Sequence, residues 1–135
     1  LQATNVHVRY LLPAGAPIEK DYVVGPKSRF NIWVDADDPR LANTDVSAVI
    51  TSTLPTIVER AMYLSTPGKT FAAGHESAGV TSLSTTWFLA EGATGNYFDL
   101  FLLIANPSST DAAVQATYLL PGGASIVKTR YCSCS

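Results

Sequence analysis

Charged residues and long apolar runs are both scarce in this chain of 135 residues. Only 15% of the residues are charged, the net charge is −2, and the basic residues form no cluster. A basic cluster is what a protein needs to displace counterions from a phosphate backbone, so we expect no nucleic-acid partner. No apolar run approaches the roughly 20 residues that a membrane-spanning helix requires. We therefore expect no membrane span, and residues 1–20 lack the pattern of a signal peptide.

Cysteine and histidine are too few for the common metal and disulfide frameworks. The two histidines, His7 and His75, have no partner at ligand spacing, so we expect no zinc site and no cofactor. The two cysteines, Cys132 and Cys134, lie at the end of the sequence. In an extended chain their Cα atoms are about 6.5–7 Å apart, near the upper limit for a disulfide. The alternatives for the two cysteines are two free thiols, a disulfide link to another chain, and a bound metal.

The abundant residues form alternating or β-branched stretches that turn residues separate. Val6, Val8 and Tyr10 alternate with polar neighbours, which gives a strand one face to bury. Pro and Gly, which favour turns, bound many of the stretches. Stretches of this kind cover residues 30–34, 46–52, 56–64, 85–89, 98–105, 114–120 and 125–131, besides the opening strand–turn–strand of residues 4–24. They predict about nine strands, with helix limited to a short turn at Pro39–Asn43.

Short strands joined by frequent turns favour an all-β fold. A chain with 47% hydrophobic residues and this length can bury a core of its own. We therefore predict an antiparallel, Ig-like β-sandwich of about nine strands.

An internal repeat links the two ends of the chain. Residues 6–20 align without gaps to residues 114–128, and the match includes Tyr-Leu-Leu-Pro, beginning at Tyr10 and at Tyr118. The offset is 108 residues (118 − 10), a length natural for one Ig-like domain and too long for a solenoid unit. The chain thus holds one period and a second copy of its opening strand–turn–strand.

Several segments resemble an uncharacterised tandem-repeat family of bacterial exported and cell-surface proteins. The similarity rests on Phe88–Thr94, Leu102–Pro107, Tyr118–Gly123, Pro26–Arg29, Val46-Ser47 and Glu59–Tyr63. In that family's order the chain spans the join of two repeats. Residues 1–65 then end one repeat, residues 66–83 form a Gly/Ser-rich connector, and residues 84–135 begin the next repeat. We expect the three parts to make one globular unit.

The resemblance implies an architecture and a location. It leads us to expect a structural, spacer or adhesive module of an extracellular or cell-surface assembly. The repeat suggests in addition that the protein is a self-associating fibre subunit. Both copies of the hairpin suit the same position beside the other strands, so the copy left over would add its strand to another chain. The apolar face of the second copy, the assembly hairpin, consists of Val114, Ala116, Tyr118 and Leu120. A carbohydrate- or protein-binding module is the alternative function, and a hydrolase is the third.

Acidic and basic residues suggest two further groupings. Asp35, Asp37 and Asp38 offer oxygen ligands for Ca²⁺, but three carboxylates are too few alone, and the pattern is also typical of a turn that caps a helix. Arg29 and Arg60 form a second group with Glu59 and Glu91, which we expect to be structural ion pairs.

Aromatic residues and one serine complete the candidates. Trp33, Trp87 and Tyr97 could form a platform for sugar rings, although aromatic residues on strands more often pack in the core. Ser77 lies in Gly74–Gly79, which lacks the first glycine of a nucleophile elbow. A hydrolase would use this serine or the pair Glu59 and Glu91. We expect that the protein is not an enzyme.

Overall fold

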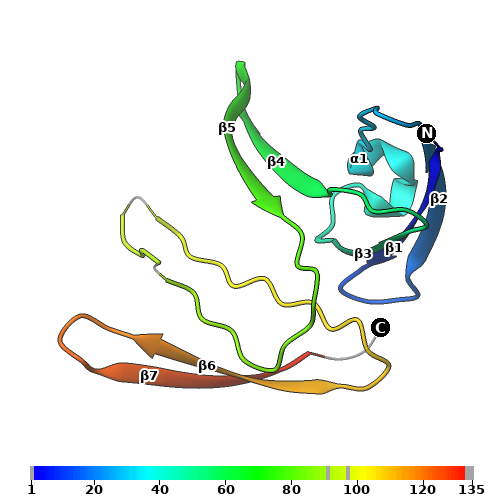
Figure 1. The fold of residues 1–135 in the computed structure, drawn as a ribbon. Helices are drawn as coiled ribbons and strands as arrows, with labels where there is room; N and C mark the ends of the chain where they lie inside the picture. Colours follow the sequence, from blue (N-terminus) through cyan, green and yellow to red (C-terminus); the bar gives the residue numbers. More distant parts are fainter. Residues whose placement is uncertain (1, 91, 97, 133–135) are drawn as a thin grey trace. The chain divides into compact units, whose positions relative to one another are not determined.

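The computed structural model describes residues 2–90, 92–96 and 98–132 and consists mainly of antiparallel β-strands (Figure 1). The strands are β1 (Thr4–Leu11), β2 (Ile18–Val24), β3 (Ser47–Ser52), β4 (Glu59–Thr66), β5 (Lys69–Ala78), β6 (Ala112–Leu119) and β7 (Ser125–Cys132). Between β2 and β3 lie two short helical turns, α1 (Val34–Asp37) and η1 (Pro39–Leu41). The all-β class predicted from the sequence is therefore confirmed.

The first sheet has three strands in the order β2-β1-β3, with β1 in the centre. Val6 lies opposite Tyr22 on β2 and opposite Ser52 on β3. The turn between β1 and β2 contains Gly15 at a φ of 93°, a conformation that glycine adopts without the steric cost of a side chain.

The core of the molecule lies on one face of this sheet. Its buried side chains are Val6, Val8, Tyr10, Ile18 and Leu41. Four of them alternate along β1 and at the start of β2, as the sequence predicts, and Leu41 comes from η1. The helical turns therefore act as a cap that brings a leucine onto the sheet.

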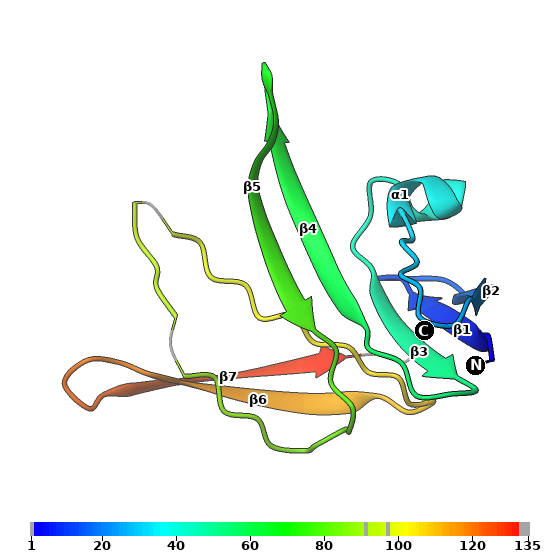
Figure 2. The same cartoon turned by 45° about the horizontal axis from the view of Figure 1, so that its top comes forward.

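Strands β4 and β5 form a two-stranded sheet of their own (Figure 2). A turn at Pro67-Gly68 joins the strands, and Gly68 has a φ of 76°. Within β5, a Cβ atom at Gly74 would lie 3.1 Å from the ring of Tyr63 on the opposite strand. Glycine is therefore used here because the neighbouring ring approaches its backbone closely.

The predicted number of strands is wrong, since the described residues form seven strands and not nine. Of the expected strand 30–34, residues 30–33 are irregular and Val34 begins α1, whose Asp37 binds Tyr22 of β2. Residues 85–89 and 98–105 have no strand partner among the described residues and stay irregular. Conversely, the predicted connector 66–83 contains β5, which pairs with β4.

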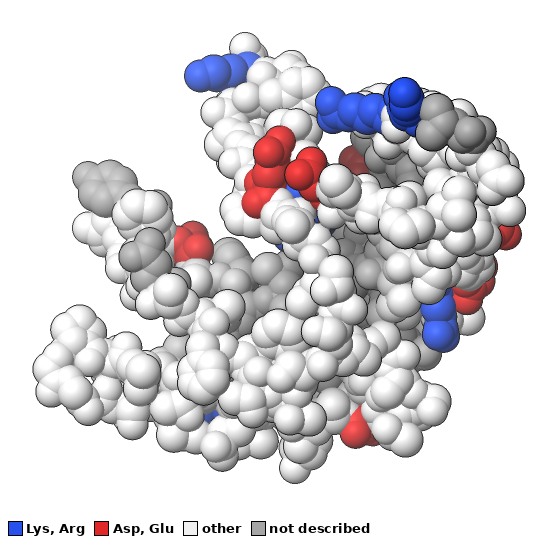
Figure 3. Space-filling view, viewed as in Figure 1, with Lys and Arg blue, Asp and Glu red and all other residues white. Residues whose placement is uncertain are grey.

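The chain divides into two units, and each is described on its own. The first unit comprises Leu1–Leu54 and Leu102–Ser135, and the second comprises Pro55–Phe101. The first unit thus contains both copies of the repeated hairpin, and the second contains β4 and β5. Charged side chains are sparse on the face seen in Figure 3, as expected for a chain with 15% charged residues.

Candidate functional site

The sequence repeat is also a repeat of strand register. Val6 faces Tyr22 in the first hairpin, and 108 residues later Val114 faces Arg130 in the second. The turn glycine recurs as well, because Gly123 has a φ of 86° where Gly15 has 93°. The hairpins β1–β2 and β6–β7 are therefore two copies of one local structure.

The first copy is covered on its inner face and extended at its edge. Strand β3 pairs along β1, and Leu41 of η1 is 2% exposed within the core cluster. Thr53 continues this contact beyond β3, because its backbone N–H donates to the carbonyl of Asn5 over 3.0 Å. A strand and a cap together complete this copy.

Polar contacts hold the cap on β2. Lys20 Nζ donates to the carbonyl oxygen of Asp37 at 3.0 Å and lies 3.7 Å from Asp38 Oδ2. The Tyr22 hydroxyl donates to Asp37 Oδ2 at 2.5 Å, and burial followed by this bond raises the pKa of Tyr22 well above its usual range. The Arg40 guanidinium, which donates to Asp38, holds the pKa of that carboxyl well below its ordinary value. Lys20 and Tyr22 therefore bind the acidic turn to β2, and both of its carboxylates, Asp37 and Asp38, are paired.

The second copy lacks both additions. Strand β6 pairs with β7 alone among the described strands. Tyr118 is 37% exposed where Tyr10 is 3% exposed, and Ile126 is 46% exposed where Ile18 is 2% exposed. The same inner face is therefore open in the second copy.

The predicted assembly hairpin residues all lie in or beside β6. Val114 and Ala116 are half-buried and Tyr118 is exposed on the same face of the strand. Leu120 follows β6, and its N–H donates to the Ala124 carbonyl across the turn. These four side chains form the apolar part of the open face, to which β7 adds Ile126.

The inner face of β7 also carries two cations. Lys128 and Arg130 stand at the positions that Lys20 and Tyr22 occupy in the first copy. The Lys128 side chain has no hydrogen bond or ion pair to any residue that the structure describes, and the Arg130 side chain donates to the neighbouring carbonyl of Thr129 at 3.0 Å. The open face therefore combines apolar side chains with two cations that contact no acid among the described residues.

The outer face of the first sheet holds a histidine between two carboxylates. His7 Nδ1 lies 2.8 Å from Asp21 Oδ1, and Nε2 lies 2.5 Å from Glu19 Oε2. Both contacts are hydrogen bonds only when both ring nitrogens carry protons. The bonds to Asp21 and then Glu19 therefore raise the pKa of His7 above its ordinary 6.5. Arg9 Nε adds an ion pair to Glu19 at 3.4 Å without hydrogen-bond geometry.

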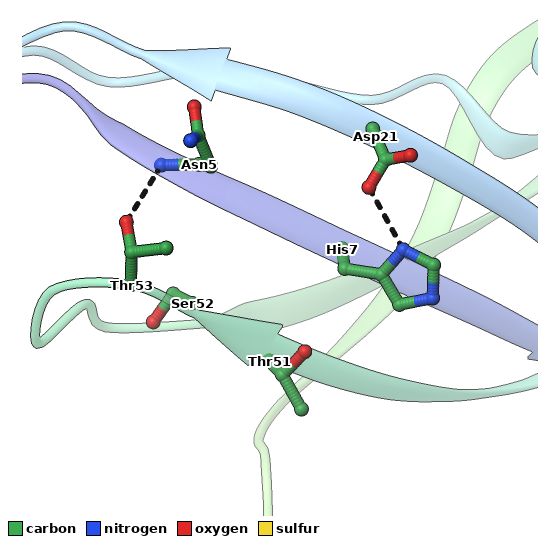
Figure 4. A pocket seen from close by; sticks show the side chains of 6 residues that line it. All are labelled: Asn5, His7, Asp21, Thr51, Ser52 and Thr53. Carbon is green, nitrogen blue, oxygen red and sulfur yellow. Dashed lines mark hydrogen bonds and ion pairs between the residues drawn. The ribbon is translucent and has the colours of Figure 1, made fainter.

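An open hollow of about 400 Å³ adjoins this cluster. Its lining consists of Asn5, His7, Asp21, Thr51, Ser52 and Thr53, from all three strands of the sheet and the chain just beyond β3 (Figure 4). The hollow offers hydroxyl groups and one carboxylate, but that carboxylate already binds His7. This arrangement can accept small polar groups.

The acidic residues proposed for calcium serve the cap. Asp37 accepts the Tyr22 hydroxyl, and Asp38 accepts both the backbone N–H and the guanidinium of Arg40. Asp35 lies in the first turn of α1. Across residues 2–90, 92–96 and 98–132, no group of three or more His, Cys, Asp or Glu is placed to hold a metal ion.

The proposed ion-pair set is not brought together in the described part of the chain. Arg29 donates to Asn31 Oδ1 at 3.1 Å, and Arg60 donates to Ser77 Oγ at 3.3 Å. Glu59 is exposed at the start of β4, and Glu91 lies outside the described residues. Ser77 itself is part of the regular strand β5 and not of a strand-to-helix elbow.

The aromatic and cysteine candidates belong to different segments of the chain. Trp33 precedes α1 in the first unit and Trp87 belongs to the second unit, and both are exposed. Tyr97 lies outside the described residues, as does Cys134. Cys132 ends β7 with a free, half-buried thiol.

Sequence reasoning missed the cluster around His7. Its signal is present in the sequence, because His7 and Arg9 alternate on one strand and Glu19 and Asp21 alternate on the next. Opposite charges at facing positions of a hairpin attract each other. The register of β1 and β2, once set, places His7 opposite Asp21 and Arg9 opposite Glu19.

Comparisons of the chain with family models, with curated proteins and with solved structures found no match. None of the helices in the described ranges has the length and apolar character needed to cross a membrane.

Proposed function

We propose that this protein is a structural module of an extracellular or cell-surface assembly and that it self-associates by strand addition. One observation carries the proposal: β6 repeats β1 in sequence and register, but no described strand pairs with it as β3 pairs with β1. An exposed strand edge with unpaired backbone groups readily accepts another strand. The edge of β6 is therefore the proposed contact.

The proposed partner is β3 of a second copy. β3 is an edge strand of its sheet, so one side of it is not paired with a strand of the described chain. Joining β6 of one copy to β3 of another uses two different surfaces. Such a head-to-tail contact forms a ring if the rotation closes and an open fibre if it does not.

The proposal extends to the finer fold and the location. Stacking of sheets that associate in this way would give the Ig-like β-sandwich expected from the sequence. The low content of charged residues suits sheets that pack against one another, since charged residues are depleted from interface cores. The resemblance to repeats of exported proteins supports an extracellular setting.

The backbone geometry identifies where a proline would block the contact. In an antiparallel strand, the N–H and C=O of one residue point to the same side, and the side alternates along the strand. The Thr53 N–H donates to the carbonyl oxygen of Asn5, so the backbone N–H and C=O groups of Asn5 and of every second residue after it in β1 point toward β3. At the repeat offset, Gln115 and Thr117 face the open edge of β6.

The test is Thr117→Pro in the full chain. Proline removes the N–H that strand addition needs but leaves the β6–β7 ladder in place. We expect light scattering to show concentration-dependent association of the original chain and its loss in Thr117→Pro. The matched control is Thr129→Pro, which removes an N–H from the outer edge of β7. A chain that stays monomeric at high concentration, or equal loss in both variants, overturns the proposal.

A further inference from the structure

The cap of the first copy shows what the inner face of a completed copy binds. It supplies a leucine to the apolar side chains and two adjacent acids to β2. Lys20 contacts the Asp37 carbonyl and the Asp38 carboxylate, and Tyr22 contacts the Asp37 carboxylate. The first copy therefore recognises a turn that has two neighbouring carboxylates and, three residues after the second carboxylate, a leucine.

The second copy keeps the residues that make this face. Val114, Tyr118, Ile126 and Lys128 repeat Val6, Tyr10, Ile18 and Lys20 without change. Lysine is retained although it meets no acid among the described residues of the second copy, where it is exposed. A solvent-exposed strand does not require lysine at this position, whereas a docked acidic turn does.

Two of the differences between the inner faces bear on the docked segment. Arg130 replaces Tyr22, so the group that faces the first acid becomes a cation with a planar fork of donors. Ala116 replaces Val8 in the apolar part, which leaves a smaller side chain beside the docked leucine. The second face is therefore more cationic and less filled than the first.

From this juxtaposition we propose that the inner face of β6–β7 docks an acidic cap segment of another polypeptide, with Lys128 and Arg130 binding its paired carboxylates and Tyr118 and Ile126 receiving its leucine. The inference rests on the proposed function and names the chemistry of the segment that completes the hairpin. The occupant resembles residues 30–52 of this chain, which carry both a cap and an edge strand.

The probe is a synthetic peptide of residues 30–52, titrated into the full chain by calorimetry. We expect saturable binding that weakens as salt is raised, because exposed charge pairs are screened. The variant Lys128→Glu with Arg130→Glu is expected to lose at least tenfold in affinity. Its matched control, Arg60→Glu with Lys69→Glu on the β4–β5 hairpin, makes the same change in net charge and is expected to bind as the original chain does.

A charge exchange guards against loss of binding through misfolding. A peptide with lysine in place of both Asp37 and Asp38 is expected to bind the Lys128→Glu, Arg130→Glu chain more tightly than the original chain. A second peptide, with Leu41→Ala, is expected to bind the original chain several-fold more weakly. Equal affinity of the first peptide for the chain and its double-Glu variant overturns the inference, as does a failure of the lysine peptide to restore binding.

The outcomes separate this inference from the proposed function. If the chain self-associates but the peptide does not bind, the acidic cap is wrong and strand addition stands. If the peptide binds with the expected charge dependence while the chain stays monomeric, docking on β6–β7 stands and self-association is wrong.

Discussion

The two copies of one hairpin end in different environments within the same chain. Tyr10 and Ile18 of the first copy are buried, whereas Tyr118 and Ile126 of the second are exposed. Their register and their turn glycines are the same, so the local sequence is not the source of the difference. Its source is the segment after β2, which adds β3 and Leu41 to the first copy alone. A hairpin sequence thus sets pairing, and a distant segment decides burial.

The outer faces of the copies differ in charge. The first copy carries His7, Arg9, Glu19 and Asp21, where the second carries Gln115, Thr117, Val127 and Thr129. The charged set forms one connected cluster on β1 and β2. The inner faces are thus similar in sequence and different in burial, while the outer faces differ in sequence itself.

The largest effect is expected from removing the leucine of the cap. Leu41→Ala takes a fully buried side chain from the core and is expected to destabilise the first sheet by about 3 kcal/mol. Urea unfolding followed by Trp33 fluorescence, in a Trp87→Phe background, reports on this unit. The control Leu119→Ala removes an exposed leucine of the second copy and is expected to change stability by less than about 0.5 kcal/mol. Equal losses of stability in the two variants would contradict the difference in burial between the two copies.

A reciprocal exchange between the copies tests the comparison at one position. Val8→Ala gives the first copy the residue of the second, and is expected to cost about 2 kcal/mol because Val8 is fully buried. Ala116→Val makes the opposite change at a half-buried position of the open face. We expect it to leave unfolding unchanged by urea denaturation and to strengthen association by light scattering. A large loss of stability in Ala116→Val would show that the second face is already filled.

The pairing of both hairpins could be predicted from the sequence because their signals are local. Alternation along β1, the Pro and Gly residues of the turns and the repeat at 108 residues together locate β1, β2, β6 and β7. The apolar face of the assembly hairpin follows from the same alternation. These features depend on residues close to one another in the chain.

Features that depend on distant partners could not be predicted. Residues 30–34 alternate like a strand, but contacts of Asp37 and Asp38 with β2 favour a helical cap. Gly74 suggested a connector, yet it lies in β5, where it pairs with Tyr63 of β4 and the Tyr63 ring approaches its backbone closely. In both places a contact across the fold decided the local structure, which propensity alone does not encode.

The smallest effect on stability is expected from the outer face, where the first copy has the titratable His7 and the second copy has the neutral Gln115. His7→Gln installs the residue that the second copy has at this position. In the original chain, bonds to Asp21 and Glu19 raise the folded pKa of His7 above its ordinary 6.5, so folding favours the protonated ring. This contribution to stability is fully present below pH 6.5 and is lost as the pH rises through the raised pKa.

The measurement is the midpoint of thermal unfolding across this pH range, with and without the substitution. The original chain is expected to lose a small increment of stability as the pH rises above 6.5, and His7→Gln to remove that increment, because both contacts of the ring are exposed and screened by water. His75→Gln is the matched control on β5, outside the cluster. An NMR titration adds a direct reading: the His7 ring should titrate above its ordinary pKa of 6.5. If His7 titrates at its ordinary value, the carboxylates do not hold the proton on His7, and the outer faces of the two copies are electrostatically closer than their sequences indicate.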